Sequence, residues 1–237
     1  ALLEREKPEA IAISFDGPRS DLQRTKVYAE YKSKQGELII GYYQRERNNV
    51  IYVDLGKVEG IFPKKYQSPR EVYHVGDRIK ALIYEVDKGK NGLQIVLSRS
   101  HAEFVTKLLE LEIPEIYDKT IEIFKIVREP GYRTKVAVYS KREDVDPVGA
   151  CVGLRGQRVK NIVRELNNEK VDIIRWDTNV KVLLANALAP AKLKSFEIDE
   201  ATRARFALAP ANQGGAQYGN VTHIREYTDT VTVPPSG

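Results

Sequence analysis

Two glycines placed three positions apart between two predicted helices constrain the fold of this sequence more than any other feature. The segment GACVGLRGQRVKNIVREL runs from Gly149 to Leu166, and it holds Gly153 and Gly156 where one helical pattern ends and the next begins. Glycine adopts backbone dihedral angles that are forbidden to other residues, and it has no Cβ atom to keep a ligand away from the main chain. A simple surface loop needs one glycine at most, so the second one requires an explanation.

The second helix of this segment is basic near the glycines. Arg155 lies between them, and no acidic residue follows until Glu165. The N-terminus of a helix presents unpaired amide groups and the positive end of its dipole, and a guanidinium group matches phosphate oxygens. We therefore predict that this segment binds the sugar-phosphate backbone of a polynucleotide. The residues predicted to contact it are Gly153, Leu154, Arg155, Gly156, Arg158, Lys160, Asn161 and Arg164.

The elements around the loop predict one compact α+β unit. TIEIFKIVRE and YRTKVAVYS alternate in hydrophobicity and are joined by Glu-Pro-Gly, which is typical of a β-hairpin. Pro147 opens the helix before the loop, and KVDIIRW predicts a strand after the second helix. This order matches a KH domain, whose GXXG loop clamps about four nucleotides. The bases would lie against Val171, Ile173 and Ile174 on that last strand.

Other glycine loops fit this spacing less well. A Walker loop ends in Gly-Lys-Ser/Thr, whereas Gln157 follows Gly156 here. A dinucleotide fingerprint needs Gly-x-Gly directly after a strand. A tight helix–helix corner with solvated arginines stays open as a structural alternative, but it explains neither the second glycine nor the lack of nearby acidic residues.

Five short β-branched and aromatic runs precede this unit. ELIIGYY, NVIYVDL, EGIF, DRIKALIYEV and GLQIVLS are separated by turn signals, and they predict a five-stranded antiparallel OB-type β-barrel. Such barrels bind single strands by aromatic stacking and a basic groove, so we expect RNA contacts from Tyr52, Lys64 and Lys65. Tyr42 and Tyr43 point to opposite faces of one strand, so at least one of them is expected in the core.

Composition limits the remaining function classes. The net charge of +5 and the pI of about 9.1 fit a polyanionic partner if the basic residues cluster. Cys151 is the single cysteine, which excludes an internal disulfide and a multi-cysteine zinc site and predicts a buried thiol in a reducing, cytoplasmic compartment. His74, His101 and His223 are scattered over different predicted elements. We expect no catalytic site, metal, cofactor or membrane span, and therefore a protein that is not an enzyme.

Longer segments carry a family resemblance. VIYVDLGKVEGIFPKKYQ, LQIVLSRSHAEFVTKLLELEIPEIYD, DVDPVGACVGLRGQRVKNIVRELNNEKVDII and LLANALAPAK closely resemble the NusA family of bacterial transcription factors, and the resemblance runs from about Val27 to Ile198. It implies an RNA-binding barrel followed by KH domains, with nascent single-stranded RNA as ligand and RNA polymerase and other Nus factors as partners. Family members bind polymerase through a separate N-terminal domain, of which this sequence keeps only the connecting helix. The sequence has no methionine, so either it is a fragment or modified residues are missing from its letters.

The predicted protein is thus a mixed α/β multidomain protein. We expect a connecting segment over residues 1–33, the OB-type barrel over 34–100, a first KH domain of type II over 101–194, and a divergent or truncated second KH-like region over 195–237. In that last region ANQGGAQYGN lacks the lysine and the glycine spacing of the family loop. In the barrel, Pro63 stands where many related barrels have histidine, and Tyr52 stands where they often have an aromatic residue.

The expected function is to bind nascent RNA and to modulate polymerase pausing, termination and antitermination. The alternative is the RNA-binding appendage of an exoribonuclease such as polynucleotide phosphorylase, in which the KH domain precedes the barrel. A third alternative is a protein-binding module that docks a partner on its helix at residues 20–33.

Overall fold

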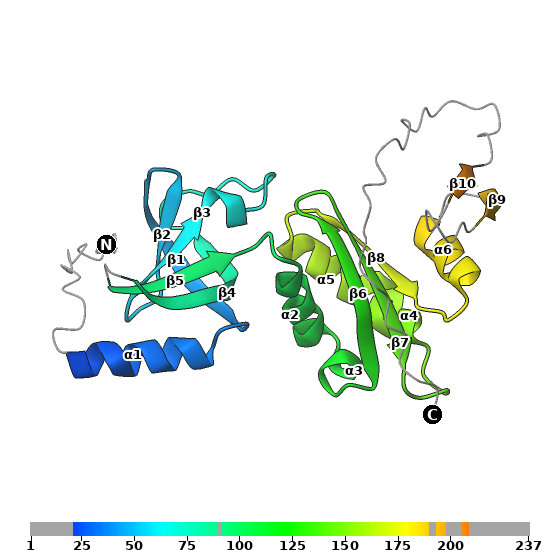
Figure 1. Cartoon of the computed structure of the whole chain (residues 1–237), viewed down its shortest axis with the longest axis horizontal. Helices are drawn as coiled ribbons and strands as arrows, with labels where there is room; N and C mark the ends of the chain where they lie inside the picture. Colours follow the sequence, from blue (N-terminus) through cyan, green and yellow to red (C-terminus); the bar gives the residue numbers. More distant parts are fainter. Residues whose placement is uncertain (1–20, 90–91, 190–192, 198–204, 209–237) are drawn as a thin grey trace, which may run out of the picture. The chain divides into compact units, whose positions relative to one another are not determined.

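The computed structural model of the protein describes residues 21–89, 92–189, 193–197 and 205–208. It contains a closed barrel, a three-stranded sheet covered by helices and a two-stranded sheet (Figure 1). The chain divides into two compact units between Ala187 and Leu188, and the first holds both the barrel and the three-stranded sheet. No helix in the described part of the chain is long and apolar enough to cross a membrane. Residues 1–20 of the predicted connecting segment and the predicted loop ANQGGAQYGN lie outside the described residues.

The barrel closes in the strand order β1-β2-β3-β5-β4. Its elements are α1 (Asp21–Ser33), β1 (Leu38–Arg47), β2 (Val50–Asp54), β3 (Glu59–Pro63), the 3-10 helix η1 (Lys64–Tyr66), β4 (Arg78–Gly89) and β5 (Gly92–Ser98). The predicted OB-type barrel is confirmed, except that the β3–β5 pair, Ile61 opposite Val96, is parallel. This pair is parallel because β5 inserts between β3 and β4 and runs in the direction of β3.

Side chains that alternate along the barrel strands fill its core. On β2, Ile51 and Val53 are buried while their neighbours are half-buried. On β1, Tyr43 is buried and Tyr42 is 54% exposed, so the prediction that one of these two tyrosines lies in the core is confirmed. The barrel therefore offers its outer face, with Tyr42, to solvent.

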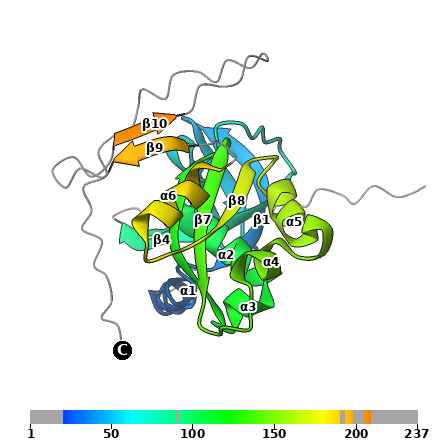
Figure 2. The same cartoon turned by 90° about the vertical axis from the view of Figure 1, so that its right-hand side faces the viewer.

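The predicted KH unit follows the barrel, and its element order is confirmed. It consists of α2 (Ala102–Glu112), α3 (Pro114–Tyr117), β6 (Ile121–Glu129), β7 (Arg133–Ser140), α4 (Pro147–Val152), the 3-10 turn η2 (Leu154–Gly156), α5 (Gln157–Glu165) and β8 (Lys170–Arg175). Strands β6 and β7 form the antiparallel hairpin, and β8 pairs with β7 in parallel (Figure 2). Val136 and Val138, two positions apart on β7, lie in one core with side chains from α2 to α5, so these helices cover one face of the sheet (Figure 1).

Cys151 of α4 lies in that same core and is fully buried. Burial raises the pKa of its thiol to about 12. The sequence-based prediction of a buried apolar cysteine rather than a reactive thiol is therefore confirmed.

A helix and a β-hairpin follow the KH unit. They are α6 (Val180–Leu188), β9 (Leu193–Glu197) and β10 (Arg205–Leu208). Strands β9 and β10 pair antiparallel with Phe196 opposite Phe206. The second KH-like region expected over 195–237 stays a prediction, because most of it lies outside the described residues.

The barrel and the KH unit share a buried boundary on β4. Leu82 packs in the core of the KH unit, whereas its neighbour Ile83 packs in the core of the barrel. Arg99 is almost fully buried beside them and binds Glu71 through two hydrogen bonds of 2.6 and 2.8 Å. Its guanidinium also donates to the carbonyl oxygen of Glu165 at the end of α5 over 2.7 Å. The domain borders at residues 33/34, 100/101 and 194/195 stay predictions. At the barrel–KH border the two units share a core residue, because Leu82 of the barrel packs in the KH core.

Glu169 joins the strands of the KH unit at the turn between α5 and β8. Its fully buried carboxylate accepts two hydrogen bonds of 2.9 Å from Arg128 on β6, one from the Thr134 hydroxyl on β7, and one of 2.7 Å from the Gly131 amide of the hairpin turn. Burial alone would raise the pKa of Glu169, but the bonds from Arg128 and Thr134 outweigh it and hold the pKa below 4.5. Glu169 is therefore charged in the folded protein, and its charge stabilises the contact between the strands.

We predict that Glu169→Gln lowers the free energy of unfolding by about 3 kcal/mol, because it leaves the buried Arg128 without its charged partner. Because the folded pKa is lowered, the stabilisation by Glu169 is complete above the ordinary pKa of 4.5 and is lost as the pH falls through the lowered value. Urea unfolding at several pH values measures both effects. Glu129→Gln, an exposed position on β6, is the control, and equal losses in the two variants would contradict the prediction.

Candidate nucleic-acid interface

The loop between α4 and α5 turns through left-handed backbone conformations. Gly153 has φ 74° and ψ 175°, Arg155 has φ 54°, and Gly156 has φ 75°. Residues other than glycine adopt positive φ values at an energetic cost. Both glycines therefore occupy positions that favour glycine, and Arg155 is held between them in a conformation that is uncommon for arginine.

The two glycines differ in their surroundings. A Cβ atom at Gly153 would lie 2.8 Å from Cγ and 2.9 Å from Cδ of Arg158. A Cβ atom at Gly156 would meet nothing closer than Cε of Lys160 at 3.8 Å. Gly153 is thus needed for packing inside the protein, whereas Gly156 leaves its side of the loop open.

Arg158, predicted as an RNA contact, binds the protein itself. Its guanidinium Nη1 donates to Oε2 of Glu115 on α3 over 2.9 Å and to the carbonyl oxygen of Ala150 on α4 over 2.6 Å. The same side chain passes under Gly153. These contacts favour a role in positioning the loop over the predicted contact with phosphate.

Two other predicted RNA contacts on α5, Lys160 and Asn161, also make hydrogen bonds within the protein. The Lys160 ammonium donates to the carbonyl oxygen of Arg155 over 3.1 Å, but its side chain is exposed. The Asn161 amide donates to Glu112 on α2 over 3.1 Å, and its oxygen accepts from Gln157. Lys160 thus supports the loop from its solvent side, while Asn161 ties α5 to α2.

Three predicted contacts are free to meet a ligand. Leu154 is 86% exposed, and Arg155 and Arg164 are exposed as well. Among the residues that the structure describes, no acidic group pairs with either guanidinium. The first turn of α5 has no side-chain cap, since its N-cap is Gly156. The loop therefore presents uncompensated positive charge at a helix start that no side chain caps.

The strand predicted to support the bases contributes less surface than expected. Val171 is only 9% exposed and belongs to the core, and Ile173 packs against that core in part. Alternation along β8 places Ile174 on the opposite face. This burial assigns Val171 to the core and leaves only the partly exposed Ile173 beside the loop helices.

The barrel residues predicted to bind RNA lie on β2 and η1. The guanidinium of Arg45 lies 4.1 Å from the centre of the Tyr52 ring, and Arg45 is paired with Glu59. The ring of Tyr52 is therefore covered on one side, with stacking available only on the other. Lys64 and Lys65 are both exposed, and the ammonium of Lys65 lies 4.6 Å from the ring centre of Tyr66.

The structure also brings together aromatic residues that the sequence analysis did not single out. Tyr84 lies between Tyr66 and His101, with ring centres 4.8 and 5.0 Å apart. Trp176 at the end of β8 lies 5.7 Å from Tyr139. The one usable signal for Trp176 was its place as the last residue of the predicted strand KVDIIRW. In the described part of the chain, no group of three or more His, Cys, Asp or Glu side chains could hold a metal ion.

Comparisons with known proteins agree with this architecture. Residues 34–99 match the model of the S1 RNA binding domain, and residues 99–176 match the NusA-like first KH domain. The chain is 48% identical over 188 residues to the transcription termination/antitermination protein NusA of Borreliella burgdorferi, which covers 78% of this chain and 39% of the relative. The NusA proteins of Halalkalibacterium halodurans and Thermus thermophilus are 43% and 45% identical, over 81% and 77% of this chain and 50% and 48% of their own lengths. The chain thus spans half or less of these relatives.

We predict that the two loop glycines respond differently to alanine. Gly153→Ala should lower the free energy of unfolding by about 3 kcal/mol, because its φ and ψ are strained for alanine and the new Cβ displaces Arg158. Gly156→Ala should cost about 1 kcal/mol, the strain of a left-handed residue in open space. Chemical unfolding followed by circular dichroism measures both. A larger loss for Gly156→Ala would refute the packing argument.

Proposed function

Because this chain belongs to the NusA family, we propose that it is the RNA-binding portion of a transcription elongation factor. It binds nascent single-stranded RNA and so modulates pausing, termination and antitermination by RNA polymerase. It does this without catalysing a reaction, and it acts in the cytoplasm. The chain spans half or less of its relatives, so the contact with polymerase is assigned mainly to a domain outside this sequence, and other Nus factors are proposed as further partners.

The observation that carries this proposal is the open cationic loop. Arg155 and Arg164 have no acidic partner among the described residues, and Gly156 leaves open space beside the first turn of α5. A phosphate group there meets the positive end of the helix dipole and amide donors that no side chain caps. Arg155 adds a charge-assisted contact. The geometry suits a chain of phosphates better than a single small anion, because the charges continue along α5 to Arg164.

The barrel supports the proposal with a second surface. Lys64 and Lys65 supply exposed positive charge, and Tyr52 offers one ring face. Single strands bind barrels of this type by such a combination of charge and stacking. The barrel precedes the KH unit, which is the reverse of the order expected for the exoribonuclease appendage. The alternative function is therefore not retained.

We predict that Arg155→Ala weakens the binding of a short single-stranded RNA and lowers the slope of log K against log salt concentration by about 0.7, the value of one phosphate contact on a single strand. The fold should persist, because the Arg155 side chain has no partner among the described residues. Fluorescence anisotropy of a labelled RNA over a salt series measures both quantities.

The control is Lys34→Ala, which removes one positive charge from a half-buried lysine that pairs with Glu30 of α1. It should leave the salt slope unchanged. An unaltered slope in Arg155→Ala would remove this arginine from the RNA contacts, and the absence of RNA binding by the unsubstituted protein would overturn the proposed function.

A further inference from the structure

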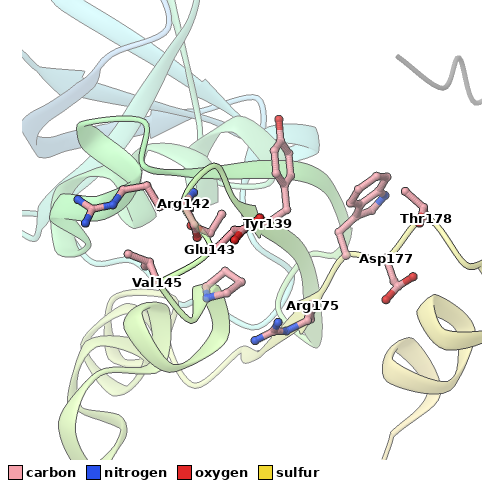
Figure 3. Close-up of a pocket in the computed structure, with 10 residues that line it drawn as sticks. Tyr139, Arg142, Glu143, Val145, Arg175, Asp177 and Thr178 are labelled. Atoms are coloured by element: carbon pink, nitrogen blue, oxygen red, sulfur yellow. Dashed lines mark hydrogen bonds between the residues drawn. The ribbon is translucent and has the colours of Figure 1, made fainter. Parts of the chain in front are cut away.

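A groove at the C-terminal ends of β7 and β8 is not used by the proposed clamp. Its volume is about 370 Å³, and Figure 3 shows the side chains that line it, among them Tyr139, Arg142, Glu143, Arg175 and Asp177. Trp176, the sole tryptophan of the chain, also lines it. Small-molecule sites range from about 300 to 1,000 Å³, so the groove is large enough for one nucleobase with its sugar.

Trp176 and Tyr139 are the aromatic residues that line this groove. The ring of Trp176 lies 4.9 Å from Phe124 and 5.7 Å from Tyr139, measured between ring centres. The main-chain amide of Trp176 donates to the carbonyl oxygen of Val138 over 2.8 Å, which fixes the residue at the edge of the sheet. A ring held in this way provides a rigid stacking surface for a planar ligand.

The charges around the groove disfavour a phosphate ligand. Arg142 is paired with Asp144 and Arg175 with Asp146, each over 2.6 Å, so both guanidinium groups are already neutralised. Two further carboxylates remain. Asp177 accepts a hydrogen bond from the main-chain amide of Asn179 over 2.7 Å, and Glu143 is exposed without a charged partner among the described residues. The groove therefore offers hydrogen-bond acceptors of negative charge beside an aromatic surface.

We propose that this groove binds one nucleobase that carries an exocyclic amino group, from the same RNA that the loop clamps. The base stacks on Trp176, and its amino group donates to Glu143 or Asp177, as carboxylates accept from the amino group of cytosine. The negative potential keeps the phosphates of that nucleotide turned toward solvent. Uracil, which has a carbonyl in place of the amino group, binds less well.

Alternation along β8 places the Trp176 ring on the face of the sheet opposite to α4, so a strand held at the clamp reaches it around the C-terminal ends of β7 and β8. Asp146 caps the start of α4 and binds Arg175 of the groove, while the clamp follows the end of α4 at Gly153. The six residues of α4 span about 9 Å. A stacked strand rises about 3.4 Å per nucleotide, so about three nucleotides cover the length of α4, and the base in the groove comes from a nucleotide beyond the four that the loop clamps. This inference rests on the proposed RNA binding at the loop.

The lone tryptophan makes the inference directly testable. Labelled octamers of cytidine and of uridine are matched pyrimidines that differ in the amino group. Anisotropy of the label measures binding anywhere on the protein, and Trp176 emission reports the groove alone. We expect the cytidine octamer to bind about tenfold more tightly and, at saturation, to change Trp176 emission more strongly than the uridine octamer does.

The variant Glu143→Gln combined with Asp177→Asn should reduce this preference to less than threefold, since amides no longer favour the amino group. The side-chain oxygen introduced by Asp177→Asn can still accept from the main-chain amide of Asn179, so the turn is retained. Glu129→Gln, at the opposite end of the β6–β7 hairpin, controls for the lost negative charge and should keep the preference.

Three outcomes separate the two proposals. Binding with a cytidine preference that the double variant abolishes supports the groove. Binding without a change in Trp176 emission, or with a preference that survives the double variant, overturns the groove and leaves the clamp in place. If neither octamer binds, the proposed function fails and the inference fails with it.

Discussion

The side chain of Arg158 passes under Gly153, where a Cβ atom would lie 2.8 Å from its Cγ. From there its guanidinium reaches both α3, at Glu115, and α4, at the carbonyl oxygen of Ala150. One close approach that only glycine permits therefore holds two helices and the start of a third in fixed relation. The loop can keep its left-handed backbone and its exposed Arg155 because this contact positions the chain on either side of it. The candidate interface depends on an internal ion pair as much as on its free charges.

Much of the fold could be predicted because its signals are local. Alternation marked the strands of the barrel and of the β6–β7 hairpin, and Pro147 and the glycines marked the ends of α4 and the loop. The opposite faces of Tyr42 and Tyr43 followed from strand geometry alone. The parallel β3–β5 pair was not predictable in the same way, because β5 begins 29 positions after β3 ends and its insertion beside β3 depends on tertiary packing.

The site was predicted less completely, for a related reason. Composition places Arg158, Asn161 and Arg164 on one basic helix without distinguishing them. Their roles separate only when α2 and α3 supply Glu112 and Glu115 from more than forty positions earlier in the chain. Arg164 meets no such partner among the described residues, so it stays available to a ligand. A sequence pattern shows which residues carry charge, whereas tertiary packing decides which charges are neutralised.

The two ends of α4 differ in charge, and this difference favours one orientation of a bound strand over the other. The end at Gly153 continues into a loop with unpaired positive charge, whereas the end at Asp146 pairs with Arg175, which lines the groove that also holds Glu143 and Asp177. A polynucleotide has a negative backbone and neutral bases with amino donors, so backbone and base are each favoured at one of these ends. A uniformly basic surface would bind phosphates at any position along it. Adjacent regions of opposite charge instead restrict the register in which a strand can lie, and short helix α4 sets the distance between them.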